Sequence, residues 1–414
     1  MTISRDSDSV WSRVWLFVGL AACAVLCAYV LTRTKPPFFD EVPYLAQAQA
    51  LTTSDSVRGW LLDNDTGPAG PVHAMMHYAL SGGQGVLPVP WFRLPNLVLL
   101  GAVLTLTGMH LRSMRVACPW PVALTGMAIP MTWVMAGMAL TEMPAMAGIA
   151  MATYAAARLG GDDVSEAPVR WGLTCLIALG VALGVCGRQT YLVALPGLLL
   201  LAAGGRRNTI HAATGLAAGL LPALWLFSTW GGLIPPKMAF VGAGLKPVHG
   251  VVAVCYAGLT AFLLAPGFFM AHWLKALPLG VLLATVNVFS HTVPFTTMTS
   301  VQRLLGYPGL ARALEAAAGW FFVAIGVAFL TAIGLELWIR RDRRFAGLAC
   351  SVLALCAVCM AVTHLFSSRY IGMTLPFMVP MLAPWIRFGP WTTVRLLVPM
   401  GIGASSLVSY YALA

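Results

Sequence analysis

The chain has 414 residues, of which 59% are hydrophobic and only 9% are charged, and its mean hydropathy is +0.81. Soluble proteins carry about 25% charged residues, so the composition excludes a soluble fold and indicates a polytopic membrane protein. The net charge of +11 would suggest a nucleic-acid partner in a soluble protein. Here no run of Lys and Arg is interleaved with stacking aromatic residues, so no nucleic-acid partner is predicted, and much of the charge is expected in cytosolic loops.

The apolar pattern predicts an all-α transmembrane helix bundle with about thirteen spans. The first span, residues 14–31, is expected to be a retained anchor, because no convincing small-residue cleavage site is present and many spans follow it. No soluble domain is expected, so residues 1–414 are predicted to form a single membrane domain. The remaining predicted spans are residues 94–110, 120–138, 143–157, 171–186, 191–203, 210–227, 250–270, 274–290, 316–338, 345–362, 371–386 and 396–412.

The strongest orientation signal is residues 340–344, which contain four arginines and are expected in the cytosol. Counting spans backwards places the N-terminus on the same side and the long loop 33–90 on the opposite side. We expect this loop to form short helices at the membrane interface. Few of the basic residues are lysine and alanine is abundant, which is typical of a GC-rich bacterium. The predicted location is therefore the bacterial inner membrane, with the functional residues on the periplasmic face.

Asp40 and Glu41 follow the first span directly. Carboxylates near lipid are costly and usually face a polar cavity, which makes them functional candidates. One of them can act as a general base on a substrate presented at the membrane surface, while the other orients a substrate. Alternatively, the acidic pair only places a helix N-terminus, and both interpretations can hold together.

Six isolated cations are predicted on the same face. Arg188 interrupts a nearly continuous apolar stretch, 171–203, so it needs a partner. A phosphate is one candidate, because the guanidinium fork matches its oxygens, and a salt bridge to Glu142 or Asp40 is the other. Glu142 is either a second acid of the site or a cap on the following helix. The six cations are Arg93, Arg188, Lys237, Lys246, Arg303 and Arg369.

The remaining cations allow two interpretations as well. Arg369 permits the same choice between phosphate and structural pairing, Arg93 can simply mark a span end, and Lys237 can belong to an ordinary loop. His73 and His77 have the i, i+4 spacing of a helical metal site, but no third ligand has convincing spacing. No metal or other cofactor is therefore predicted.

These short motifs, in this order along the chain, resemble those of the GT-C class of membrane glycosyltransferases, which use polyprenyl-phosphate sugars as donors. Asp40-Glu41 is similar to the acidic motif of the class in its first non-cytosolic loop, and the turn around Glu142 looks like its second acidic loop. Within the class, the chain looks most like the dolichyl-phosphoglucose-dependent α-1,2-glucosyltransferases and their prokaryotic relatives. Arg188-Gln189-Thr190 matches their arginine-glutamine-threonine element, and Arg369-Tyr370 their late arginine-tyrosine.

The resemblance implies a GT-C fold and an inverting transfer of a sugar to a lipid-linked or polymer acceptor. It also implies that membrane lipids surround the protein and that the reaction requires no metal. Asp40 is expected to take the acceptor's proton, Glu41 to orient Asp40 or a sugar hydroxyl, and Glu142 to hold the acceptor or an arginine. The candidate catalytic residues are Asp40 and Glu41, and the candidate substrate- and phosphate-binding residues are Glu142, Arg188, Gln189, Arg369, Lys237 and Arg93.

Two other functions use the same residues. A transporter or flippase for an anionic lipid or sugar would bind its cargo through the arginines, and internal inverted repeats, of which none is visible, would favour it. A non-catalytic assembly subunit would leave Asp40 dispensable. An acidic cluster on one face without a counterpart on the other favours an enzyme.

Overall fold

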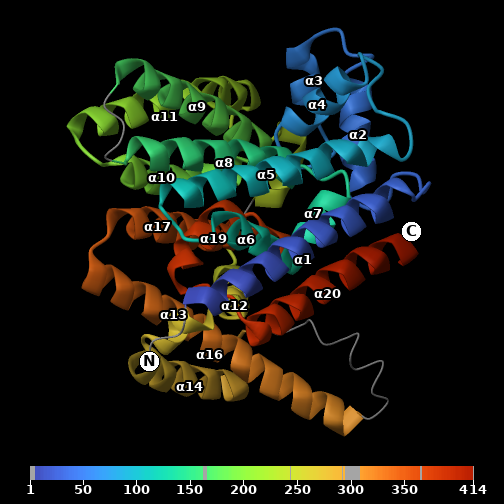
Figure 1. Ribbon diagram of the computed structural model, residues 1–414. Helices are drawn as coiled ribbons and strands as arrows, with labels where there is room; N and C mark the ends of the chain where they lie inside the picture. The colour runs from blue at the N-terminus through green and yellow to red at the C-terminus, as the bar shows by residue number, and fades with distance from the viewer. Residues whose placement is uncertain are drawn as a thin grey trace.

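The computed structural model describes residues 5–161, 166–242, 244–290, 292–293, 308–363 and 366–413. All regular secondary structure in these ranges is helical. Figure 1 shows the long helices packed side by side, with a group of short helices at one end of the bundle. The predicted all-α transmembrane bundle is therefore confirmed.

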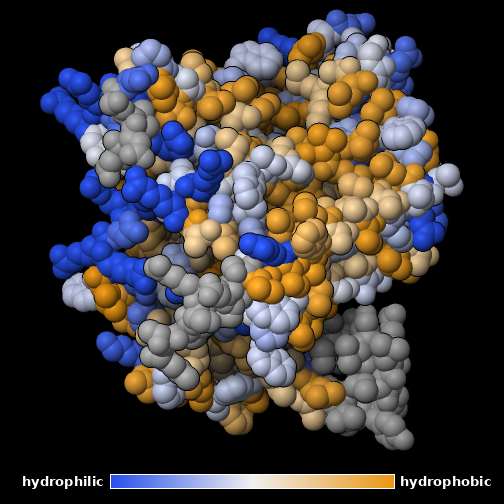
Figure 2. All heavy atoms as spheres, viewed as in Figure 1, coloured by the Kyte–Doolittle hydropathy of each residue, from blue (hydrophilic) through white to orange (hydrophobic). Residues whose placement is uncertain are grey.

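Nine helices of the described chain are long and apolar enough to cross a membrane. Many of their outward-facing side chains are large and hydrophobic, such as Phe17, Leu221 and Trp338, which are 71%, 64% and 76% exposed. Figure 2 shows hydrophobic side chains over much of the visible face. Such a surface suits lipid rather than water. The nine helices are α1 (Arg5–Leu31), α5 (Leu94–Ser113), α9 (Ala167–Gly187), α11 (Arg206–Trp230), α12 (Pro247–Leu264), α14 (Trp273–Ser290), α16 (Pro308–Arg340), α17 (Arg343–Val358) and α20 (Pro390–Leu413).

Four of the thirteen predicted spans are short or broken rather than long continuous helices. One of them, 250–270, divides at Ala265 into α12 (Pro247–Leu264) and α13 (Pro266–Met270). The segment predicted as span 120–138 divides into α6 (Pro119–Leu124), η2 (Thr125–Ala128) and α7 (Pro130–Gly137). Pro130 causes one break, because a residue before proline avoids the helical region, and Ile129 is extended. The other two are a short apolar helix over Gln189–Ala202, formed by η3 (Gln189–Ala194) and α10 (Leu195–Ala202), and one over Leu375–Trp385, formed by α19 (Leu375–Leu382) and η6 (Ala383–Trp385).

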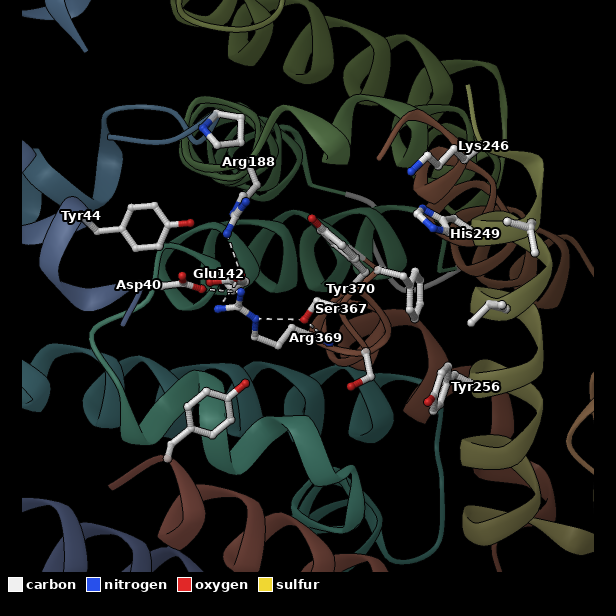
Figure 3. Close-up of a pocket in the computed structure, with 16 residues that line it drawn as sticks. Asp40, Tyr44, Glu142, Arg188, Lys246, His249, Tyr256, Ser367, Arg369 and Tyr370 are labelled. Atoms are coloured by element: carbon white, nitrogen blue, oxygen red, sulfur yellow. Dashed lines mark hydrogen bonds and ion pairs between the residues drawn. The ribbon is translucent and has the colours of Figure 1, made fainter. Parts of the chain in front are cut away.

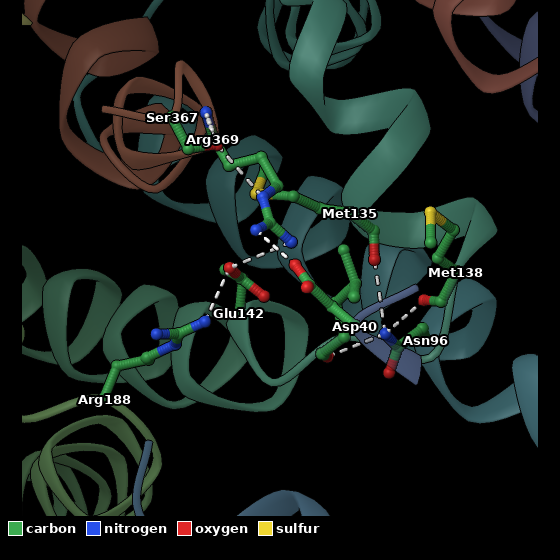
Figure 4. A network of polar contacts seen from close by, with 9 residues as sticks. Asp40, Asn96, Met135, Met138, Glu142, Arg188, Ser367 and Arg369 are labelled. Atoms are coloured by element: carbon green, nitrogen blue, oxygen red, sulfur yellow. Dashed lines mark hydrogen bonds and ion pairs between the residues drawn. The ribbon is translucent and has the colours of Figure 1, made fainter. Parts of the chain in front are cut away.

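A sharp bend of 115° between α7 and α8 (Glu142–Leu159) places Glu142 at the start of a buried helix. Asn96, near the start of α5, holds this bend. Its amide nitrogen lies 2.7 Å from the carbonyl oxygen of Met138 and 2.9 Å from that of Leu140, as Figure 4 shows for the first contact. The interruption therefore has a fixed geometry.

The first long loop folds into short helices, as predicted: α2 (Glu41–Ala50), α3 (Val57–Asp63), α4 (Val72–Leu80) and η1 (Trp91–Arg93). Gly70 attaches this loop to the end of α9, since its amide donates to the carbonyl oxygen of Gly187 at 3.1 Å. A Cβ at Gly70 would lie 1.8 Å from the carbonyl oxygen of Cys186, so only glycine fits there. This contact holds the loop beside Arg188, which follows α9 directly.

The remaining short elements are η4 (Pro236–Gly242), α13 (Pro266–Met270), η5 (Cys359–Ala361) and α18 (Arg369–Gly372). Of these, η5 and α18 lie between α17 and α19. Arg369 is the first residue of α18, so the late arginine of the sequence sits at the start of a one-turn helix.

Candidate active site

A cavity of about 840 Å³ lies where several separate parts of the chain meet. Figure 3 shows two groups of polar side chains in it, with Tyr370 and Ser367 between them. One group contains Asp40, Glu142, Arg188 and Arg369, and the other contains Lys246 and His249. The residues that line the cavity are Asp40, Tyr44, Pro68, Glu142, Arg188, Lys246, Val248, His249, Val252, Tyr256, Phe366, Ser367, Ser368, Arg369, Tyr370 and Tyr410.

The first group is a chain of ion pairs (Figure 4). Arg369 Nη2 lies 2.5 Å from Asp40 Oδ2, and Arg188 Nη2 lies 2.6 Å from Glu142 Oε1. Arg369 Nη1 is 3.9 Å from the same Glu142 oxygen, so Glu142 lies between the two arginines. The structure thus brings together four of the predicted site residues from positions up to 329 residues apart in the chain.

The four side chains differ in their access to the cavity. The Asp40 side chain is 46% exposed, whereas those of Glu142 and Arg188 are 2% and 8% exposed. Burial alone would lower the pKa of Arg369, but the charges of Glu142 and Asp40 outweigh it and raise that pKa. Glu142 Oε2 and Arg188 Nε have no hydrogen-bond partner among the described residues. The buried pair therefore retains capacity for a ligand.

Each side chain is positioned by local backbone structure. Asp40 lies in a tight turn in which the Glu41 amide donates to the Phe38 carbonyl oxygen at 3.0 Å, and Phe39 has a positive φ of 47°. Arg188 is extended where α9 ends. Arg369 Nε donates to Ser367 Oγ at 3.1 Å, which fixes its guanidinium over the cavity.

Glu41 and Arg93 form a buried pair that does not line the cavity. Arg93 Nε and Nη2 donate to the two Glu41 carboxylate oxygens at 2.8 and 2.6 Å, and both side chains are 0% exposed. The Glu41 carboxylate also accepts from the amides of Ala139 at 2.9 Å and Phe38 at 3.2 Å. The pair therefore connects the loop of Asp40 to the α7–α8 bend, rather than contributing to the cavity wall.

The structure also places Gln189 and Lys237 away from the cavity lining. Gln189 Nε2 donates to the carbonyl oxygen of Pro68 at 2.6 Å, so it supports the wall from behind. Lys237 Nζ lies 3.0 Å from Asp63 Oδ1 in an exposed pair. Arg303 lies outside the described residues.

The second half of the cavity was not predicted, apart from Lys246 as an isolated cation. The ring of Tyr256 stacks on that of Phe366 with centroids 5.8 Å apart and planes 14° apart. His249 Nδ1 is 2.6 Å from the carbonyl oxygen of Val362, and its ring lies 5.8 Å from that of Phe366. These aromatic residues sit in apolar sequence, where an aromatic residue usually indicates a packed core, so no sequence signal distinguished them.

His73 and His77 lie on α4 behind Tyr44, with ring centroids 4.5 Å apart. Burial lowers the pKa of His77 to about 4 and that of His73 well below its usual value, which favours the neutral form of both rings. No group of three or more His, Cys, Asp or Glu side chains in the described ranges can hold a metal ion. The pair is a buried polar contact behind the cavity wall.

Among solved structures, the crystal structure of ArnT from Cupriavidus metallidurans bound to undecaprenyl phosphate matches 95% of this chain, with a TM-score of 0.52 and 15% identity. The chain is similar in fold to ArnT. The match spans 64% of the ArnT chain, so this chain corresponds to less than two thirds of that protein. The likeness confirms the GT-C type of transmembrane bundle that was predicted from the sequence.

The apo structure of ArnT from the same organism also matches, with a TM-score of 0.42 and 13% identity over 90% of this chain and 77% of that one. No protein-family model and no curated protein sequence matches the chain.

Proposed function

We propose that the protein is an inverting glycosyltransferase that moves a sugar from a polyprenyl-phosphate donor to a hydroxyl of a lipid-linked or polymer acceptor. The observation that carries this proposal is the cavity in which a half-exposed carboxylate, Asp40, lies beside two arginines, Arg188 and Arg369. The similarity in fold to ArnT supports it, because that crystal structure holds undecaprenyl phosphate, a polyprenyl phosphate. We place the reaction on the periplasmic face of the bacterial inner membrane.

In the proposed reaction, the acceptor oxygen attacks the anomeric carbon as the bond from that carbon to the phosphate oxygen breaks. The acceptor proton passes to the Asp40 carboxylate, whose exposure within the cavity allows contact with a hydroxyl. The electron pair of the broken bond leaves with the polyprenyl phosphate. A phosphate is a good leaving group, so no general acid is needed.

The arginines stabilise the charge that develops on the departing phosphate. Each of them now pairs with a carboxylate, so a bound phosphate competes for guanidinium hydrogen bonds. Arg369 is the more accessible, with its side chain 18% exposed against 8% for Arg188. We infer that the donor phosphate takes Arg369 away from Asp40, which frees the carboxylate for the acceptor. Glu142, which lies between the two arginines, keeps both of them in place.

The other half of the cavity is suited to the sugar or the acceptor. Lys246 and His249 supply polar groups beside the stacked rings of Tyr256 and Phe366. Binding sites commonly combine aromatic walls with a few polar groups that fix orientation. The resemblance of the short motifs to the dolichyl-phosphoglucose-dependent enzymes favours a hexose as the transferred sugar.

Arg188→Gln is expected to reduce kcat/KM for the polyprenyl-phosphate sugar about 10²–10³-fold, since it removes a charged donor aimed at the developing phosphate charge. Steady-state kinetics with varied donor concentration measures the change. Arg58→Gln is the matched control, because Arg58 is exposed in α3 and does not line the cavity. An equal loss in both variants would contradict a role for Arg188 at the phosphate.

The proposed function is tested with purified protein in liposomes, a panel of radiolabelled polyprenyl-phosphate sugars and a membrane-lipid extract as acceptor. Transfer of label from one donor to the acceptor, absent in protein-free liposomes, is the expected result and identifies the sugar. Label that crosses the bilayer without changing its chemical form would instead identify a transporter or flippase. An absence of both transfer and transport would favour the assembly subunit.

A further inference from the structure

The two consecutive phenylalanines before Asp40 have different surroundings. Phe38 is buried, and its ring centroid lies 5.0 Å from that of Tyr411 and 5.0 Å from the guanidinium carbon of Arg93. Phe39, in contrast, is 48% exposed. Packing in the core therefore accounts for an aromatic residue at position 38, but it does not account for one at position 39.

The backbone of Phe39 lies in the left-handed region, with a φ of 47°. A bulky residue rarely adopts this conformation, because its Cβ crowds the carbonyl oxygen that follows, whereas glycine adopts it freely. The other two non-glycine residues with a positive φ in the described ranges, Arg115 and Arg341, follow helix ends, where this conformation is common. Phe39 precedes a helix instead. Backbone strain of this kind collects at functional sites, so the exposed ring is a candidate for a functional contact.

Two neighbouring aromatic rings hold the ring of Phe39 despite its exposure. It lies edge-on to Phe38 and edge-on to Tyr410, with ring centroids 5.7 Å apart in both cases. Tyr410 lines the active-site cavity, and Asp40 follows Phe39 directly. Phe39 and Tyr410, which we call the aromatic lip, therefore lie at the edge of the cavity beside the proposed base.

The aromatic lip also belongs to the lipid-facing surface of the protein. Tyr410 is part of α20, one of the helices long enough to cross the membrane, and is 36% exposed. Val408 on the same helix and Val42, three residues after Phe39, are 47% and 50% exposed. Figure 1 shows α1 and α20 side by side, ending at the same side of the molecule. Exposed apolar residues on such a helix suit lipid, so the aromatic lip lies between the membrane and the polar cavity.

A polyprenyl-phosphate donor has a matching layout, since its charged phosphate is joined to an apolar chain that stays in the membrane. Under the proposed function the phosphate binds Arg369, whose Nη2 lies 2.5 Å from Asp40 Oδ2. The Cα atoms of Asp40 and Phe39 are about 3.8 Å apart, as in any two consecutive residues. The first isoprene units of a donor bound at Arg369 therefore come within reach of the aromatic lip, whose rings supply a large apolar contact area.

We propose that the aromatic lip binds the first isoprene units of the donor's polyprenyl chain, and that Phe39 is a specificity-determining residue for the lipid part of the donor. The inference rests on the proposed function, because it takes the donor phosphate to lie at Arg369. An aromatic residue that only anchors the protein in bulk lipid needs neither a left-handed backbone nor a position next to Asp40. The unfavourable backbone of Phe39 is retained because its ring contacts the donor.

The test compares Phe39→Gly with the wild type in neutral detergent. Its melting temperature should not fall, because glycine adopts a positive φ without strain and the removed ring is half exposed. Its affinities for undecaprenyl phosphate and for geranyl phosphate, measured by native mass spectrometry, should both fall roughly tenfold, since both lipids carry the first isoprene units. Phe39→Trp keeps an aromatic ring and should retain most of the affinity. Phe240→Gly is the matched control, because Phe240 is 70% exposed and does not line the cavity, and it should bind both lipids within about twofold of the wild type.

The possible results separate this inference from the proposed function. Binding of undecaprenyl phosphate that Phe39→Gly does not weaken would overturn the inference alone and leave Phe39 as an anchor in bulk lipid. A loss for undecaprenyl phosphate but not for geranyl phosphate would overturn contact with the first isoprene units. A loss of equal size in Phe240→Gly, or a lower melting temperature of Phe39→Gly, would overturn a specific contact as well. A wild type that binds neither lipid would overturn the proposed function together with the inference.

Discussion

Asp40→Asn is expected to reduce sugar transfer about 10²–10⁴-fold while binding of the polyprenyl-phosphate donor changes little. Asparagine has nearly the same shape as aspartate and can still hydrogen-bond to Arg369, which lies 2.5 Å from the carboxylate in the wild type. It cannot accept the proton of the attacking hydroxyl. The loss should therefore appear in kcat and not in donor affinity, which single-turnover transfer and equilibrium binding measure separately.

Asp55→Asn is the matched control for this prediction. Asp55 is exposed in the same loop and does not line the cavity, so its replacement should leave transfer unchanged. Equal transfer by wild type and Asp40→Asn would remove Asp40 as the base. A loss of donor binding with no further loss in the chemical step would instead assign Asp40 to holding Arg369.

The structure shows one of the two partners that the sequence offered for Arg188, since the residue pairs with Glu142 at 2.6 Å. It also lines the cavity, and phosphate binding there stays a prediction. The interrupted apolar stretch predicted that Arg188 needs a partner. It could not predict which one, because the partner is 46 residues away in the chain and the bend before α8 decides where it lies.

The sequence could not separate the roles of Asp40 and Glu41. They are adjacent, equally acidic, and both precede or begin a short helix. Their side chains nevertheless diverge, because α2 starts at Glu41 and turns that side chain toward Arg93 and the amide of Ala139, which is 98 residues away. Contacts between residues so far apart in the chain depend on how the helices pack, and local sequence does not encode that packing.

Periodicity predicted the long spans well, since an uninterrupted apolar helix is the simplest way to satisfy the backbone in lipid. It was less informative near the cavity, where α6, η2 and α7 replace one continuous helix. Interrupted helices are tolerated at membrane depth where neighbouring groups satisfy the freed backbone, and here Asn96 contacts the carbonyl oxygens of Met138 and Leu140. One departure from the predicted pattern, the bend between α7 and α8, thus places Glu142 at the cavity.

Breaking the Glu41–Arg93 pair is expected to have the largest effect on stability. Both side chains are 0% exposed, so Arg93→Met leaves a buried carboxylate without its counter-ion and Glu41→Leu leaves a buried guanidinium. Each single variant should lose about 3–5 kcal/mol in the free energy of unfolding. The double variant should lose much less than the sum, because the second substitution removes the uncompensated charge. Denaturant unfolding in mixed micelles gives the four values of the cycle.

The Lys237–Asp63 pair provides the control, since its side chains are 50% and 76% exposed. Lys237→Met should lower stability by no more than about 1 kcal/mol, as expected for a solvated ion pair. Glu41 contacts Arg93 and the amide of Ala139 and does not line the cavity, so we expect any loss of transfer in Glu41→Gln to accompany a loss of stability. A Glu41→Gln protein that is as stable as the wild type but inactive would contradict this role and place Glu41 at the reacting groups.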